Sequence, residues 1–253
     1  MSNLPVPTTE SGPRLPQVIA PPADAPSFDE LFTFMRDAEL RFGSLRMRIV
    51  DRLATARGDE AEVIEVWLRH PGQAKVLVHA EGDGPRTGGR VWVGDGSLVR
   101  TYDTRTAATT SRPVRARPAG LGNDTLPAFS RVYEPRTQLP AETLGEAFIH
   151  PNGYCRNVLA TGDLTLLGTT RLRDRETWLI RCAHPRRAQL LTDRPDRSIE
   201  VGVDRLTGLI VLLVERIAEN VTRHAEVTDL QVDAPIGDDA FALHVPDEAR
   251  RLY

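Results

Sequence analysis

The residues of this chain that could bind a metal or act as nucleophiles are few and widely spaced. Three of the six histidines precede proline, which is typical of turns: His70, His150 and His184. The other three lie in strand-like runs without a paired ligand: His79, His224 and His244. Cys155 and Cys182 match no zinc spacing, so we expect two buried free thiols. Motifs of metalloproteases, P-loop proteins and serine hydrolases are absent from the sequence.

We therefore predict that the protein is not an enzyme and has no cofactor and no metal. A cluster of two histidines and a carboxylate in one pocket would restore the enzyme interpretation.

Apolar residues offer a different chemistry, the binding of a hydrophobic ligand. Three tryptophans and a tyrosine fall in predicted strands, and a short helix carries a phenylalanine. Together with one isoleucine they are the expected cavity lining: Trp67, Trp92, Tyr102, Phe148, Trp178 and Ile180. The alternative is that these side chains simply make a core. The predicted helices are few for so much sheet, which favours a cavity that the helices cover.

Arginines are concentrated in residues 104–138, which contain six of them against Asp124 and Glu134. Such a long loop is either a solvated connection or a functional surface. The functional interpretation is docking of an acidic partner by Arg105, Arg112, Arg115 and Arg117. The net charge of −3 excludes a general nucleic-acid binder, because phosphate binding needs a basic surface.

The elements that position these residues are mostly strands. Ser27 and Glu30 form a capping-box pattern that begins a helix over residues 28–42. Short helices are expected at 140–149 and 154–160. Strands are expected on both sides of the Gly94-Asp95-Gly96 turn, at 164–172 and 177–182, and again through 198–245. Strands do not alternate with crossover helices, which favours the α+β class with one antiparallel sheet.

A change of phase in residues 221–232 predicts curvature. In an unbroken strand, Ala225 and Val227 would point to one face of the sheet, whereas Leu230 and Val232 would point to the other. A β-bulge near Thr228 would reconcile them, and such bulges bend sheets.

The ends of the chain set the expected domain organisation. Residues 1–26 are rich in proline and have little that could pack, so we expect a disordered tail followed by a single domain over 27–253. The sequence shows no signal peptide, lipid-anchor cysteine or transmembrane segment, and the expected location is cytoplasmic.

Three segments together resemble the LolA/RseB-like lipoprotein-carrier superfamily. They are the hairpin Val91–Asp103, the strand–turn–strand unit over 199–211 with its Asp-x-x-Thr-Gly turn, and the last strand-like runs over 227–246. The resemblance implies a strongly curved antiparallel sheet, an unclosed half-barrel, with an N-terminal helix and short plug helices on its concave side. Members of this group bind acyl chains or lipoproteins in that cavity, or act as lipid-responsive regulators.

Two functions from different classes remain open. The first is a non-enzymatic protein that holds a hydrophobic ligand, an acyl chain or lipid, in a half-barrel cavity. The second is a cytoplasmic interaction or regulatory module with a filled half-barrel, which docks a protein partner through the arginines of 104–138. The volume of the interior separates them: a hollow interior favours the first and a filled interior the second.

Overall fold

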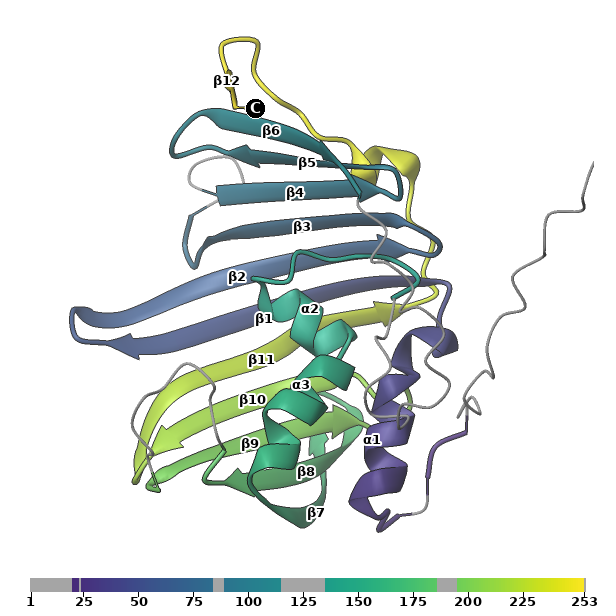
Figure 1. The fold of residues 1–253 in the computed structure, drawn as a ribbon, viewed down its shortest axis with the longest axis vertical. Helices are drawn as coiled ribbons and strands as arrows, with labels where there is room; N and C mark the ends of the chain where they lie inside the picture. Colours follow the sequence, from purple (N-terminus) through teal and green to yellow (C-terminus); the bar gives the residue numbers. More distant parts are fainter. Residues whose placement is uncertain (1–19, 23, 84–88, 115–134, 186–194, 253) are drawn as a thin grey trace, which may run out of the picture.

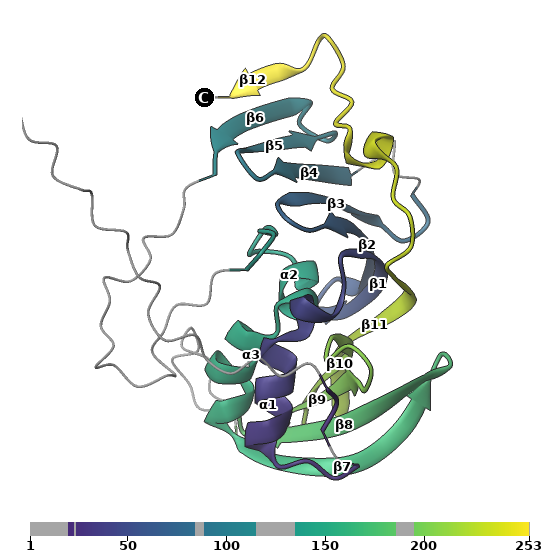
Figure 2. The same ribbon diagram turned by 90° about the vertical axis from the view of Figure 1, so that its right-hand side faces the viewer.

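One large, curved and unclosed sheet makes up most of the protein (Figures 1 and 2). The computed structural model describes residues 20–22, 24–83, 89–114, 135–185 and 195–252. The strand order in the sheet is β12-β6-β5-β4-β3-β2-β1-β11-β10-β9-β8-β7. Neighbouring strands are antiparallel except β12 and β6, which are parallel. The α+β antiparallel half-barrel predicted from the sequence is confirmed.

The strands have the following bounds in chain order: β1 (Ser44–Thr55), β2 (Gly58–Arg69), β3 (Gln73–Ala80), β4 (Gly89–Asp95), β5 (Leu98–Asp103), β6 (Ala108–Pro113), β7 (Asp163–Leu172), β8 (Arg175–Ala183), β9 (Arg197–Asp204), β10 (Ile210–Ile217), β11 (Asn220–Val232) and β12 (Arg250–Leu252).

The N-terminal helix begins where its capping box predicts. In α1 (Phe28–Arg36) the Ser27 side chain accepts from the Glu30 amide, and the Glu30 carboxylate accepts from the Ser27 amide at 2.9 Å. The chain continues as the 3₁₀ turn η1 (Ala38–Arg41). The predicted helix over 28–42 is therefore α-helical only in its first part.

Two short helices complete the concave layer, as Figure 2 shows. They are α2 (Leu144–Ile149) and α3 (Asn152–Asn157), followed by the 3₁₀ turn η3 (Leu159–Thr161). α2 lies close to β2, because a Cβ added at Gly145 would be 3.0 Å from the Val66 side chain. The Val66 face of the sheet is therefore the concave face.

The register of the sheet extends this face from strand to strand. Val66 pairs with Met47 on one side and with Val76 on the other, and Val76 pairs with Trp92. These side chains share the concave face, because paired residues point to the same side and alternate residues to the opposite side. The core is built from this face and the apolar sides of the helices.

The predicted bulge in β11 is confirmed. Arg48 pairs with Asp229 and Ile49 with Val227, so Thr228 is the extra residue. The bulge brings Val227 and Leu230 to the same concave face, opposite Ile49 and Met47. It lies near the middle of the sheet, where extra local twist bends both halves around the helices.

Two expectations from the sequence are wrong in detail. The arginine-bearing segment over 104–138 is not a continuous loop, because residues 108–113 form β6 beside β5. Residues 241–245 are not a strand: Phe241 ends the 3₁₀ turn η4 (Asp238–Phe241), and residues 242–245 form no helix or strand. From there the chain runs past the strand ends to β12, and Lys75 Nζ donates to the Ala242 carbonyl at 3.0 Å on the way.

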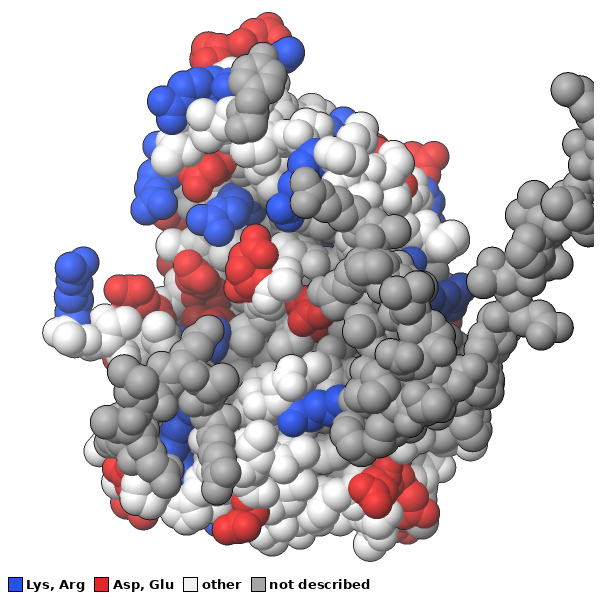
Figure 3. Space-filling model, viewed as in Figure 1, with Lys and Arg blue, Asp and Glu red and all other residues white. Residues whose placement is uncertain are grey.

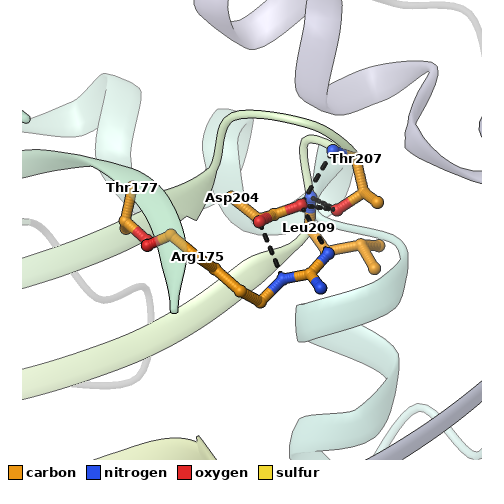
Figure 4. A network of polar contacts seen from close by, with 5 residues as sticks. All are labelled: Arg175, Thr177, Asp204, Thr207 and Leu209. Atoms are coloured by element: carbon orange, nitrogen blue, oxygen red, sulfur yellow. Dashed lines mark hydrogen bonds and ion pairs between the residues drawn. The ribbon is translucent and has the colours of Figure 1, made fainter. Parts of the chain in front are cut away.

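The turn between β9 and β10 fixes α1 to the sheet (Figure 4). The Asp204 carboxylate accepts from the amide and hydroxyl of Thr207, at 2.8 and 2.5 Å, and from Arg175 at 2.9 Å. Gly208 follows with φ of 76°, and a Cβ at this position would lie 3.1 Å from the Phe34 ring. Glycine thus supplies both the left-handed backbone and the room for Phe34.

We predict that Asp204→Asn destabilises the fold by about 2–3 kcal/mol, because it leaves the Arg175 guanidinium without its buried counter-charge. The matched control is Asp174→Asn, since the Asp174 side chain is 96% exposed and its ion pair contributes little. Urea unfolding of both variants measures the difference. Equal stabilities would show that the turn does not depend on this carboxylate.

Candidate functional site

The concave side is filled at one end of the sheet. Side chains of α1, α2 and η3 are at most 1% exposed there: Phe34, Phe148, Ile149 and Leu159. Trp178 and Ile180 of β8 face them and are fully buried. The Phe34 and Trp178 rings meet edge to face at 5.9 Å. Four of the six predicted lining residues, Trp92, Phe148, Trp178 and Ile180, therefore belong to one buried hydrophobic core.

The indole of Trp178 is also satisfied as a hydrogen-bond donor. Its Nε1 donates to the carbonyl of Asp24 at 3.1 Å. The Asp24 carboxylate pairs with Arg205, whose guanidinium lies 5.1 Å from the Trp178 ring centroid. Pro26 is buried as well. The last residues of the expected N-terminal tail thus pack on the sheet, and residues 1–19 and 23 lie outside the described part of the chain.

The concave face carries an open groove of about 420 Å³ beside Trp92 of β4. The β2–β3 turn, strands β4 and β5 with the turn between them, Val114 and the 135–138 segment line it: Pro71, Gly72, Trp92, Gly94, Gly96, Val99, Val114, Pro135, Arg136 and Gln138. Trp92 is 6% exposed, and none of the described lining residues is acidic. Its volume lies within the roughly 300–1,000 Å³ range of small-molecule sites.

The structure places the other two predicted lining residues on the convex face. Trp67 pairs with Arg46 and lies between the cations of Arg46 and Lys75, at 6.0 and 5.8 Å. Tyr102 pairs with Val91, next to Trp92 in β4 but on the opposite face. The six residues therefore do not line one space, because each strand's phase depends on its register with its neighbour.

A polar cluster supports one wall of the groove. The His70 Nδ1 and the Thr137 hydroxyl are 2.8 Å apart, and the Gly72 amide donates to the same hydroxyl at 2.8 Å. The amide of Arg136 donates to the Glu39 carboxylate at 2.9 Å. These bonds join the β2–β3 turn and the 135–138 segment to η1. Burial lowers the pKa of His70 to about 4, and the nearby Glu39 carboxylate only partly opposes this effect.

His150 lies in the same cluster, with its Nε2 3.5 Å from the Glu39 carboxylate. Two histidines and a carboxylate thus come together, as an enzyme would require. However, Glu39, His70 and His150 are not among the residues that line the groove beside Trp92. Their side chains tie η1, the β2–β3 turn and the end of α2 to one another.

A second cleft, of about 340 Å³, lies at the other ends of strands β2 to β5. Its lining carries charges of both signs: Asp51, Glu62, Arg90, Asp103, Arg105, Glu142 and Arg223. Arg223 is bidentate to Asp51, and Arg90 is 3.7 Å from Asp103. Figure 3 shows acidic and basic side chains intermixed over this part of the concave side.

The predicted docking arginines are only partly described. Arg105 lies at the rim of the second cleft and Arg112 is exposed in β6. Arg115 and Arg117 lie outside the described residues.

Other expectations concern metals, thiols and membranes. Both cysteines are free and buried, as expected. The described residues contain no group of three or more side chains that could hold a metal ion. No described helix is long and apolar enough to cross a membrane.

Comparison with known proteins identifies the fold. Neither a family model nor a curated protein matches the sequence. The solved structure of MucB matches with a TM-score of 0.50 and 15% identity over 85% of this chain and 62% of MucB. The structure of the MucA/MucB complex of Pseudomonas aeruginosa matches with a TM-score of 0.49 and 14% identity, over 86% of this chain and 61% of the matched chain. A LolA superfamily protein from Nitrosomonas europaea matches with a TM-score of 0.34 and 8% identity, over 87% of this chain and 99% of the matched chain.

This chain thus spans less than two thirds of the MucB chains that it matches. At these identities the likeness shows a fold, and the LolA/RseB-like fold predicted from the strand motifs is confirmed. Nothing in these comparisons supports the cytoplasmic location expected from the sequence.

We predict that the free energy of unfolding increases as the pH rises from about 4 to about 6.5. In this window the unfolded chain binds a proton at residue 70 that the folded chain does not, so the folded state is favoured at the higher pH. The effect is about 1–2 kcal/mol after allowance for partial exposure of the ring.

Urea unfolding at several pH values, compared between the wild type and His70→Gln, isolates this contribution. The free energy of unfolding of His70→Gln should change less with pH than that of the wild type. The control His244→Gln changes an exposed residue of the C-terminal segment, and its free energy of unfolding should follow the wild type. A His70→Gln curve parallel to the wild type would contradict the assignment.

Proposed function

We propose that this protein is a non-enzymatic binding protein that holds an apolar ligand, such as an acyl chain, in the groove beside Trp92. The observation that carries the proposal is the unequal filling of the concave side. Helix α1 packs on β8 through Phe34 and Trp178, and α2 packs on β2, whereas the described residues leave a groove open at β4 and β5. The ligand site is thus one part of the concave face and excludes Trp178, Ile180 and Phe148.

The groove has the properties that such a ligand needs. Its floor is the Trp92 ring, and Val99 and Val114 add aliphatic surface. Burial of apolar area contributes about 25 cal/mol per Å² before ordering costs are subtracted. We further propose that residues 27–253 form a single domain, since β1 to β12 belong to one sheet.

We predict that Trp92→Ala weakens binding of the neutral dye N-phenyl-1-naphthylamine by about tenfold or more, because it removes the apolar floor of the groove. Dye fluorescence measures the affinity, and native mass spectrometry with lipid extraction identifies any ligand that copurifies. The matched control is Trp67→Ala, which removes the same side chain from the convex face.

Circular dichroism and thermal unfolding establish that both variants are folded. The proposal fails if the wild type binds no apolar probe, or if Trp67→Ala weakens binding as much as Trp92→Ala.

A second function, docking of a protein partner, is favoured by the filled end of the half-barrel. In that case Arg105 and Arg112 would contact an acidic surface of the partner. A variant with both residues changed to Gln should lose a partner that the wild type retains, whereas Arg46→Gln on the convex face should keep it. Retention of the partner by the Arg105 and Arg112 variant would argue against this function.

A further inference from the structure

One wall of the groove, the 135–138 segment, is held by few polar contacts. In the described part of the chain, its hydrogen bonds come from Arg136 and Thr137 alone. The Arg136 amide donates to both oxygens of the Glu39 carboxylate, at 3.1 and 2.9 Å. The buried Thr137 hydroxyl meets the ring of His70. The wall thus depends on one carboxylate of η1 and on the β2–β3 turn that carries His70.

The hydrogen-bond pattern assigns the protons of Thr137 and His70. The Gly72 amide donates to the Thr137 hydroxyl oxygen at 2.8 Å, and the proton of that hydroxyl has His70 Nδ1, also at 2.8 Å, as its acceptor. A neutral ring therefore carries its own proton on Nε2, which is shielded from water and has no partner among the described residues. A proton added at Nδ1 would take the acceptor from Thr137 and leave a charged Nε2–H without one.

The surroundings of His70 also oppose a charged ring. Three charged or titratable groups face it: Glu39 of η1, Arg136 of the wall and His150 at the end of α2. Arg136 and a charged His150 repel an imidazolium, and the one attracting carboxylate, Glu39, already accepts from the wall. The Phe42 ring is stacked on His70 with the centroids 5.3 Å apart, and it shields that face of the ring from water. Burial is the largest cause of the low pKa of His70, about 4.

The turn that carries His70 is anchored independently of the wall. The His70 amide donates to the Gly43 carbonyl at 2.9 Å. Gly72 packs on the β4–β5 turn, where a Cβ added at Gly72 would lie 3.0 Å from the Cα of Gly96. Among the described residues, the wall has no comparable second set of hydrogen bonds. If the contact between Thr137 and His70 breaks, the wall is therefore the part that moves, and the ring gains water.

We propose that this contact is a proton-operated latch: uptake of a proton by His70 releases the 135–138 wall of the groove, and an apolar ligand in the groove opposes the release. The released state binds more protons than the latched state, so a fall in pH from about 6.5 towards 4 favours release. The effect of a ligand rests on the proposed function, whereas release of the wall does not.

Hydrogen exchange of the whole chain measures the latch through the protection of the Arg136 and Gly72 amides, corrected for the intrinsic pH dependence of exchange. From pH 7 to pH 5 this protection should fall by roughly 5- to 20-fold in the wild type, because the pKa of the ring is about 4 in the latched state and 6.5 once the ring is hydrated. The amides of β1, in the middle of the sheet, should keep their protection, because the rest of the fold stays intact.

Three variants separate titration of the ring from the contact itself. His70→Asn cannot titrate, but its amide can replace Nδ1 in the contact, so the protection of Arg136 should be the same at pH 7 and pH 5. Thr137→Val removes the hydroxyl and keeps the shape, so protection should be low already at pH 7 and independent of pH. His244→Gln changes an exposed residue of the C-terminal segment and should follow the wild type.

The dye N-phenyl-1-naphthylamine, which is neutral over this pH range, tests the link to the groove. A ligand that binds only the latched state must stabilise it by mass action. Dye at ten times its dissociation constant should therefore raise the protection of Arg136 by about tenfold at pH 5.

The outcomes keep the latch apart from the proposed function. Equal protection of Arg136 at pH 7 and pH 5 in the wild type overturns the latch, and so does an equal loss of protection in His70→Asn. A loss that extends to the β1 amides would show global acid unfolding and also overturns it. A dye that binds without raising the protection overturns the link to the ligand. If the dye does not bind at either pH, the proposed function fails, and the protection alone decides on the latch.

Discussion

The buried carboxylate of Asp204 is the interaction on which the concave side depends. The side chain is 2% exposed, and it would be costly to bury without the four donor groups of Arg175 and Thr207 around it. By holding Thr207, it sets the turn in which Gly208 gives room to Phe34. Arg41 of η1 donates to the Thr207 carbonyl at 2.9 Å and lies 3.7 Å over the Phe34 ring. The turn thus contacts α1 through Phe34 and η1 through Arg41.

The coverage that follows is unequal along the sheet. Near β8 the ring of Phe34 from α1 packs on Trp178, and the backbone carbonyl of Asp24 accepts a hydrogen bond from Trp178 Nε1. Near β4 the described helices leave the face open, and Trp92 keeps an unpaired donor. One sheet therefore carries two buried tryptophans in different settings: Trp178 donates to the chain's own backbone, and Trp92 lies beside a groove. A half-barrel can in this way be both well packed and open to a ligand.

The sequence predicted those features that are local to one strand or helix. The capping box at Ser27 and the bulge at Thr228 follow from residues a few positions apart, and both are present. The sequence could not predict on which face of the sheet Trp67 lies, because this depends on the register of β2 with β1 and β3. The strand β6 was missed since its flanks are rich in arginine, proline and turn residues. The unpaired donor of Trp92 has no sequence signal, because its absent acceptor is a property of the packed sheet.

The margins of the sheet have a consequence for association between copies of the chain. An open sheet of this length has two edges, and exposed edges with free backbone groups promote strand pairing between molecules. At one edge, β12 runs parallel to β6 over three residues and covers part of it. At the other, the ladder of β7 shifts between Leu166 and Gly168, which interrupts the regular pattern that a further strand would need. Both margins thus carry an irregularity that disfavours strand pairing between copies of the chain.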